Sequence, residues 1–261
     1  MTDANALPPE TLEGWYALHQ IFSIDHTALR AYDAVAWRTA RCAAADTMDE
    51  LAATDEGWSA VAELVGSTGD VMFMHLRPTL DALGDIQRRV ARLQAMDVLR
   101  PRFNFLSVTE VGLYQLAAHG ADDPKKAERI QAEKESAHVQ RRLYPTIPAD
   151  MPYVSFYPMS KRRDTGQNWY TLSLPERSRL MQSHGLTGRR YAGRVLQVIT
   201  GAIGFNTWEW GVTLFAKNPL EFKKLVTEMR FDEASAKYAD FGEFFVGTVI
   251  QPSDWLESLA P

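Results

Sequence analysis

The sequence predicts an α+β fold built from two ferredoxin-like units, each with the element order β-α-β-β-α-β. In the C-terminal half, β-branched and aromatic runs alternate with helical apolar spacing in that order, and the N-terminal half repeats it. The segments FMHLRPTLDAL and TLFAKNPLEF match best, because each joins an apolar strand to a proline at a helix start. This period is far longer than that of solenoid repeats, which indicates duplication of one unit.

The C-terminal unit has the clearer local signals. Ser173 and Glu176 form a capping-box pattern with Pro175 in the first turn, so a helix is expected to begin there and to end at Gly185. The first strand is expected to break at Pro158. Strands are expected over 153–158, 191–201, 208–216 and 241–250, and a second helix over 218–229.

The N-terminal unit is expected to repeat this order. Its strands are expected over 14–24, 58–66, 70–77 and 103–114, and its helices over 26–54 and 77–93. The chain then divides into a first repeat over 1–114, a connecting segment over 115–150 and a second repeat over 151–261 that carries the ligand site. Two such units can stack their sheets or close them into a dimeric α/β barrel, and either arrangement encloses space between sheet and helices.

The connecting segment is polar and rich in charge over 119–138, which indicates a solvated linker that is helical in its middle. Its last part, RRLYPTIP, combines two arginines, an aromatic residue and two prolines, and is expected to be ordered.

Composition excludes several classes of function. The 261 residues carry a net charge of -5 with a pI near 5.7, which argues against a nucleic-acid binder. The single cysteine, Cys42, excludes an internal disulfide framework and a cysteine metal cluster, and we expect it to be buried in an alanine-rich helix. The acidic N-terminus does not resemble a secretory signal, and no apolar run reaches membrane-spanning length. A cytoplasmic protein without membrane insertion is therefore expected.

Four side chains are candidates for chemistry. His184 precedes a glycine at the expected helix end, where it can be a cation set against the helix dipole or the single axial ligand of a haem iron. Tyr157, at a strand end, can be amphipathic packing or a redox-active phenol. Lys161 can be a surface cation or can hold a carboxylate by a charge-assisted hydrogen bond, and Arg142 invites the same two interpretations.

Two further residues carry weaker signals. Gln197 lies in the otherwise apolar run RVLQVITG, where it must find hydrogen-bond partners. It can serve as a structural hydrogen bonder or as a neutral donor over an open metal face. Ser235 is typical of a cap or a local backbone contact.

The segments FYPMSKRRDTGQNWY and LMQSHGLTGRRYAGRVLQVITG, together with 208–247, resemble the coprohaem decarboxylases, the haem-synthesis branch of the chlorite dismutase-like superfamily. The resemblance implies a chlorite dismutase-like fold and a role for each matching residue. It implies that His184 is the axial iron ligand, Tyr157 the radical relay, Lys161 the partner of a reactive propionate, Met159 a substrate contact, Gln197 the distal amide, and Arg142 and Ser235 propionate anchors.

The resemblance also implies a reaction. Hydrogen peroxide would drive oxidative decarboxylation of two propionates of iron-coproporphyrin III (coprohaem) to vinyl groups, giving haem b through a three-propionate intermediate. Coprohaem would be both substrate and redox centre. A homopentamer and a transient contact with a ferrochelatase are implied as well.

Two alternatives stay open at this point. The first is a peroxidase or chlorite dismutase of the same fold, although the latter carries an arginine where this chain has Gln197. The second is a haem-binding protein without turnover, which would need His184 but has no use for Tyr157 beside Lys161. The connecting segment also lacks a tyrosine that some relatives place near a propionate, so its contacts are left unassigned.

Overall fold

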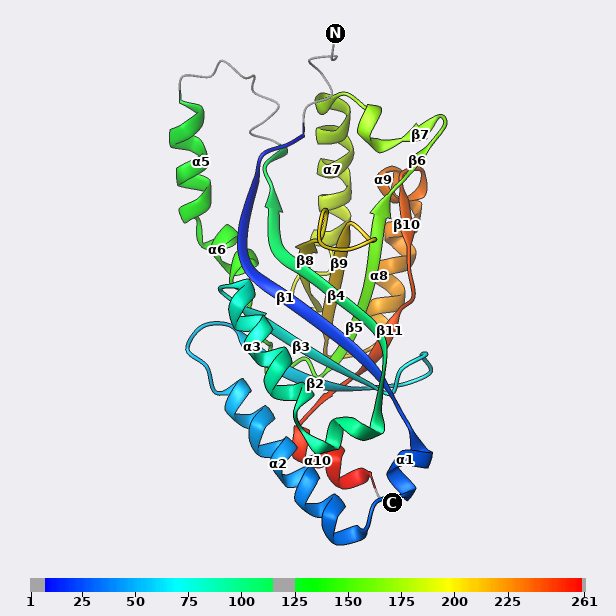
Figure 1. Ribbon diagram of the computed structural model, residues 1–261. Helices are drawn as coiled ribbons and strands as arrows, with labels where there is room; N and C mark the ends of the chain where they lie inside the picture. The colour runs from blue at the N-terminus through cyan, green and yellow to red at the C-terminus, as the bar shows by residue number, and fades with distance from the viewer. Residues whose placement is uncertain (1–7, 115–124, 260–261) are drawn as a thin grey trace.

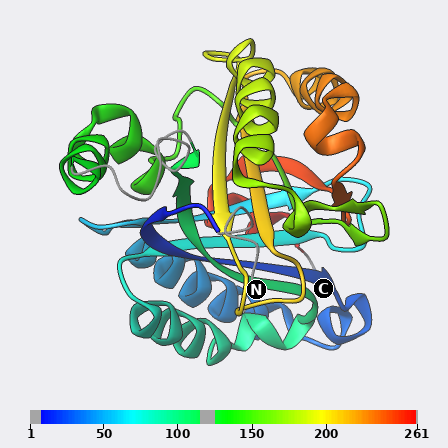
Figure 2. The same cartoon turned by 90° about the horizontal axis from the view of Figure 1, so that it is seen from above.

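The computed structural model describes residues 8–114 and 125–259. Strands form the centre of the molecule. The helices of the N-terminal half and the C-terminal helix 252–258 cover one side, and the helices 174–189 and 220–231 cover the other (Figures 1 and 2). The predicted α+β fold of two ferredoxin-like units is confirmed, because each half has the order β-α-β-β-α-β.

The N-terminal unit is built on two long strands that lie side by side, β1 and β4. The single helix expected over 26–54 is divided into α1 and α2, and the 3-10 helix η1 adds to the expected elements. Its elements are β1 (Thr11–Ile24), α1 (His26–Arg30), α2 (Ala34–Ala52), β2 (Trp58–Leu64), β3 (Val71–Arg77), α3 (Leu80–Ala91), η1 (Gln94–Val98) and β4 (Leu99–Gly112).

The C-terminal unit follows two helices that flank the barrel, α5 (Lys126–Glu135) and α6 (Ala137–Leu143) (Figure 1). These helices lie in the expected connecting segment, of which 115–124 falls outside the described residues. The unit comprises β5 (Tyr153–Lys161), β6 (Arg163–Asp164), β7 (Gln167–Asn168), η2 (Trp169–Thr171), α7 (Leu174–Arg189), β8 (Val195–Gly201), β9 (Trp210–Ala216), α8 (Leu220–Phe231), α9 (Glu233–Ala236), β10 (Ala239–Phe241), β11 (Phe245–Ile250) and α10 (Pro252–Ser258).

The two units share one sheet, in the order β10-β5-β11-β2-β3-β1-β4-β8-β9. An additional pairing of β5 with β9 closes the strands from β5 to β9 into a barrel, with β10 alongside β5. The units meet where β11 pairs with β2 and where β4 pairs with β8. Closure leaves these barrel strands without a free edge, which stabilises an antiparallel sheet against association with other chains.

Strand alternation divides the core into layers. The barrel interior draws side chains from both units, including Ile21, Met74, Phe105, Phe156 and Phe215. The outer face of the N-terminal strands packs against α2, α3 and α10, and the outer face of the C-terminal strands packs against α7 and α8. The second outer layer contains the predicted ligand residues.

Several element boundaries differ from the sequence prediction, three of them next to the candidate site. Strand β5 continues through Pro158, because that residue lies where the strand changes neighbours from β11 to β10 and its missing N–H removes no ladder bond. Helix α7 does not end at Gly185 but continues to Arg189, and the following turn uses Gly193, whose φ is 78°. Strand β8 starts at Val195, after that turn.

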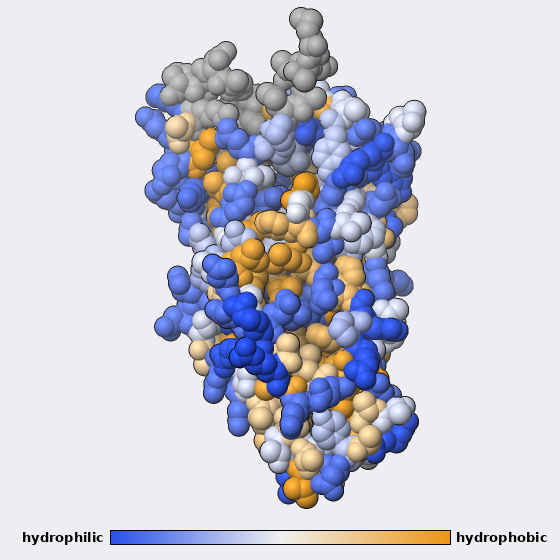
Figure 3. Space-filling view, viewed as in Figure 1, coloured by the Kyte–Doolittle hydropathy of each residue, from blue (hydrophilic) through white to orange (hydrophobic). Residues whose placement is uncertain are grey.

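Cys42 is exposed on α2, so its predicted burial is wrong. Ala40 and Ala44 of this helix pack inward with Trp37 and Met48, while Cys42 lies on another face of the same helix. Within the described ranges, none of the helices is long and apolar enough to cross a bilayer. The space-filling view shows polar side chains over most of one face, with apolar ones gathered near its middle (Figure 3).

Candidate functional site

The candidate site lies between the outer face of the C-terminal strands and helices α7, α8 and α9. Tyr157, Met159 and Lys161 alternate along β5, so their side chains share one face. Strand β9 lies between β5 and β8 and pairs with both. On β8, Gln197 pairs with Leu214 of β9, and Leu214 belongs to the same core cluster as Tyr157. Strand pairing therefore brings residues from distant parts of the sequence onto one surface.

His184 projects from α7, which covers this surface. Its Nδ1 lies 2.9 Å from Oδ2 of Asp232, whose side chain is only 3% exposed. When Nδ1–H donates to this carboxylate, Nε2 keeps the lone pair that a metal needs, and the ring orientation is fixed. The interpretation of His184 as a cation at a helix terminus is wrong, because α7 continues to Arg189.

Tyr157 is almost completely buried, with 8% of its surface exposed. Its ring stacks on Phe244 at 4.4 Å between centroids and meets Phe241 at 5.9 Å. Burial raises the pKa of the Tyr157 phenol well above its ordinary range, and the nearby positive charge of Arg230 only partly opposes this. The phenol is thus neutral at physiological pH and can lose an electron only together with its proton.

Lys161 is not the surface cation that its sequence context allowed. Burial lowers the pKa of its ammonium to about 8, while Asp232 and Glu209 act in the opposite direction. Its Nζ donates to the carbonyl of Ala234 at 3.3 Å and lies 4.1 Å from the centre of the Trp169 ring. A buried ammonium with so few partners can still receive an anion.

Asp232 connects the axial-ligand candidate to the lysine. It accepts a hydrogen bond from His184 and raises the pKa of Lys161 by its charge. Ser235 lies in the same place: it is 5% exposed on α9, and its backbone N–H donates to the carbonyl of Asp232 at 3.1 Å. Three predicted site residues thus gather around Asp232.

Gln197 faces α7 from the strand side. A Cβ added to Gly188 would lie 3.5 Å from Gln197 Nε2 and 3.2 Å from the Met229 methyl, so this end of the helix is close to the sheet. Gln197 is partly buried on β8. Its predicted role as the distal amide stays a prediction.

Arg142 lies at the other end of the layer, on α6. Burial lowers the pKa of its guanidinium, and the carboxylate of Glu110 on β4 opposes this shift. Glu110 accepts a hydrogen bond from Trp210 Nε1 at 3.2 Å, and Trp210 pairs with Met159 across β9 and β5. Arg142 is therefore connected to the site wall through two residues.

Three residues of this layer were missed by the sequence reasoning. Asp232 follows α8 in the run RFDE, where nothing in the local sequence indicates that it pairs with a histidine. Arg177 is 3% exposed on α7, and its charge partly opposes the rise that burial causes in the pKa of the Tyr114 phenol. Its spacing of seven residues from His184 places both on one helical face, a signal that was present in the sequence. Glu110 had no local signal.

The donor set suits a large anionic ligand with one metal. Across 8–114 and 125–259, no three His, Cys, Asp or Glu side chains gather into a metal-binding group. A single histidine with a carboxylate partner, aromatic walls and two partly buried cations fits an iron porphyrin bearing acidic side arms. In that arrangement His184 would hold the iron, and Lys161 and Arg142 would lie near carboxylates.

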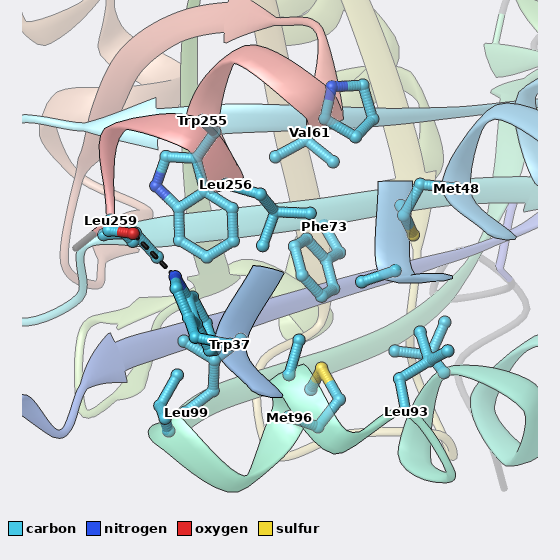
Figure 4. A pocket seen from close by; sticks show the side chains of 15 residues that line it. Trp37, Met48, Val61, Phe73, Leu93, Met96, Leu99, Trp255, Leu256 and Leu259 are labelled. Atoms are coloured by element: carbon cyan, nitrogen blue, oxygen red, sulfur yellow. Dashed lines mark hydrogen bonds between the residues drawn. The ribbon is translucent and has the colours of Figure 1, made fainter. Parts of the chain in front are cut away.

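A well-enclosed pocket in the N-terminal unit is of a different kind. It lies between the sheet, α2, η1 and α10 and is lined by apolar side chains, among them Met48, Phe73 and Trp255 (Figure 4). Trp37 Nε1 donates to the carbonyl of Leu259 at 2.7 Å, which fastens the C-terminal segment over it. The lining contains no ionisable side chain, so this pocket offers no chemistry.

Comparisons with known proteins agree with this description. Residues 40–250 match the family model described as chlorite dismutase. A protein of Staphylococcus carnosus named coproheme decarboxylase is 42% identical over 252 residues, which span 95% of this chain and 96% of that protein.

Solved structures extend the comparison. A structure described as a novel heme-binding protein from Thermus thermophilus is 38% identical, with a TM-score of 0.85 over 97% of this chain and 98% of that chain. A mutant chlorite dismutase from Candidatus Nitrospira defluvii has a TM-score of 0.75 at 18% identity, over 96% of this chain and 97% of that chain. At that identity the likeness shows the fold alone.

Proposed function

The chain belongs to the chlorite dismutase family, and from this membership we propose that it is a coproheme decarboxylase, which converts two propionates of iron-coproporphyrin III to vinyl groups with hydrogen peroxide as oxidant. The relative with that name covers nearly the whole chain at 42% identity. One observation carries the proposal furthest. A histidine oriented by a buried carboxylate, a buried phenol and a buried ammonium all border the same layer between sheet and helices.

In the proposed mechanism, His184 binds the iron through Nε2 while Asp232 holds its other ring nitrogen at 2.9 Å. The iron porphyrin, when bound, is the group that reacts with peroxide, and each peroxide provides the two oxidising equivalents that one propionate needs. Tyr157 passes on one of these two equivalents by losing an electron and its proton together. Its neutral, buried phenol favours this coupled loss over a separate deprotonation, because burial disfavours the phenolate.

The tyrosyl radical takes a hydrogen atom from the β-carbon of a propionate. Loss of carbon dioxide and of one more electron then leaves a vinyl group, so that each propionate consumes one peroxide and one proton and yields carbon dioxide and two waters. Transfer requires the β-carbon to lie close to the Tyr157 oxygen. Strand β5, paired on both sides, is rigid enough to fix that oxygen.

Lys161 lies four residues beyond Tyr157 on the same strand face. We propose that it binds the carboxylate of the reacting propionate and thereby presents the β-carbon to the phenol. Met159 lies between them on this face, in position to contact the substrate, and Arg142 and Ser235 are proposed anchors of other propionates. Gln197 is the proposed neutral amide on the peroxide side of the ring.

We further propose a homopentameric, cytoplasmic enzyme that consists of the repeats 1–114 and 151–261, joined by 115–150, and that receives its substrate in a transient contact with a ferrochelatase. These proposals rest on the family resemblance alone. The net charge of -5 argues that nucleic acid is not a partner.

The deciding experiment is titration of the coprohaem complex with hydrogen peroxide, followed by mass spectrometry of the pigment. We expect stepwise loss of two carboxyl groups. Tyr157→Phe should bind coprohaem with near-normal affinity but release no carbon dioxide, and decarboxylation at the parental rate would exclude the phenol as relay.

A second candidate function is haem binding without turnover, favoured by the description of the 38% identical protein from Thermus thermophilus as heme-binding. The same titration separates the two. If pigment with all its carboxyl groups is recovered after excess peroxide, the protein binds haem and does not process it.

A further inference from the structure

Glu110 is a carboxylate at the edge of the candidate site to which the proposed reaction gives no role. Its Oε1 accepts the hydrogen bond from Trp210 Nε1, and its Oε2 lies against Gly201 of β8. A Cβ at Gly201 would lie 2.4 Å from that oxygen. The carboxylate thus occupies a defined position between β4, β8 and β9.

The charges around Glu110 are few and of both signs. Arg142 on α6 is its cationic neighbour, Glu13 on β1 is an anionic one, and burial is the main cause that raises the pKa of Glu110. Two residues beyond the end of β4, Tyr114 feels the charge of Glu110 as well as that of Arg177 on α7. In this surrounding, the negative charge of Glu110 is stabilised chiefly by Arg142 and Trp210.

Arg142 is held on a rigid support beside Glu110. Thr109 Oγ1, in the residue before Glu110, donates at 2.7 Å to the carbonyl of Leu143, the residue after Arg142. Gly14 leaves room for this contact, because a Cβ there would lie 2.2 Å from the same carbonyl oxygen. The position of the arginine relative to the carboxylate is therefore fixed by the backbone of both elements.

We propose that Glu110 is a positioning residue that holds Trp210 in place at the edge of the site, serves as the counter-charge of Arg142, and takes up a proton when a ligand carboxylate binds to Arg142. This inference rests on the proposed function, which supplies a ligand with four carboxylates. Before binding, Glu110 is the counter-charge of the arginine. After binding, Arg142 is shared with the ligand, and two carboxylates face each other in a partly buried place.

The physical consequence is linkage between ligand binding and protonation. Burial already raises the pKa of Glu110, and a second anion raises it further, so the bound state holds more protons than the free state. Affinity for a tetracarboxylate should then fall as pH rises, and removal of the Glu110 charge should abolish that part of the dependence.

The test uses metal-free coproporphyrin and the full-length protein. Calorimetric titration in two buffers of different ionisation enthalpy measures the protons taken up on binding. Glu110→Gln keeps an oxygen that can accept from Trp210 and removes only the charge. We expect it to take up about one proton fewer than the wild type and to bind more tightly at alkaline pH. Glu63→Gln, an exposed carboxylate on β2, is the matched control and should leave both quantities unchanged.

A second variant tests the geometry without removing the charge. Gly201→Ala should displace the Glu110 carboxylate and weaken coproporphyrin binding, and Trp210 fluorescence should report the displacement. If wild-type protein binds no coproporphyrin, the proposed function fails. If it binds and Glu110→Gln takes up as many protons as wild type, the proposed function stands and the role of Glu110 is overturned.

Discussion

Asp232 accepts a hydrogen bond from Nδ1 of His184 at 2.9 Å, and its carboxylate is 3% exposed whereas the imidazole is 31% exposed. A buried carboxylate makes the imidazole a stronger ligand, because it stabilises positive charge on the ring. The more exposed imidazole keeps Nε2 available for iron. This one contact thus determines both the direction of the ring and its basicity.

Asp232→Asn should therefore weaken the iron–imidazole bond while preserving a hydrogen-bond acceptor. We expect the iron–histidine stretching band in resonance Raman spectra of the ferrous complex to move to lower frequency, and affinity for the iron porphyrin to fall about 10–100-fold. Asp240→Asn, which changes an exposed carboxylate paired with Arg162, is the control. An unchanged band in Asp232→Asn would mean that another residue holds the iron.

Lys161 gives a dependence of stability on pH whose sign follows from its lowered pKa. The folded protein releases the proton near pH 8, whereas the unfolded chain keeps it to about 10.5. Between these values the unfolded state binds more protons, so the free energy of unfolding should rise with pH by about 3 kcal/mol. Lys161→Met should lose that rise in urea unfolding from pH 7.5 to 10, and exposed Lys223→Met should retain it.

The same residue predicts a limit on ligand binding. Above pH 8 the neutral amine no longer attracts a carboxylate, so coprohaem affinity should decline. Lys161→Arg keeps its charge through this range and should flatten the decline. Equal pH profiles for wild type and Lys161→Arg would contradict the assignment of Lys161 to a propionate.

Elements with strong local signals were predictable from the sequence. The capping box at Ser173 and Glu176 forms as expected, with Glu176 accepting from the Ser173 backbone at 3.1 Å. The strand–proline–helix pattern shared by the two halves revealed the duplication, and the duplication led to the barrel. These signals act within a few residues, so sequence alone contains them.

Boundaries set by distant partners were not predictable. Pro158 stays within β5 because β11 and β10 meet there, and neither neighbour is visible in the local sequence. The same holds for the site: Lys161 is buried by Trp169 and Ala234, which tertiary packing brings to it. The candidate residues came from local sequence context and their roles from the resemblance, whereas Glu110 became visible only through its contacts.

Phe244 should hold the Tyr157 ring in place, because the two rings stack at 4.4 Å. Phe244→Ala is expected to cost about 1 kcal/mol beyond the lost burial and to slow peroxide-driven decarboxylation while leaving coprohaem bound. Phe231→Ala removes a phenylalanine that is 86% exposed and should change neither quantity. A parental rate in Phe244→Ala would show that the stacking does not orient the phenol.

His19 links acid sensitivity to the shared interior of the barrel. Its ring is buried, stacks on Phe156 at 4.2 Å and lies 2.9 Å from Thr213 Oγ1, and burial lowers its pKa to about 3. In the unfolded chain the His19 ring is protonated below about pH 6.5, whereas in the folded protein it stays neutral. The unfolded state therefore binds one more proton, and the free energy of unfolding decreases as the pH is lowered.

Between pH 7 and 5 this loss amounts to about 2 kcal/mol for His19. His19→Gln keeps a polar partner for Thr213 but does not titrate. Over this pH range its free energy of unfolding should therefore fall by about 2 kcal/mol less than that of wild type. This difference is expected even if the variant is less stable at pH 7. Exposed His26→Gln should follow the wild-type curve. His19 lies on β1 and Thr213 on β9, so their contact joins the two repeats. If the free energy of unfolding of wild type and His19→Gln changed in parallel with pH, acid would open the barrel at a place other than this contact.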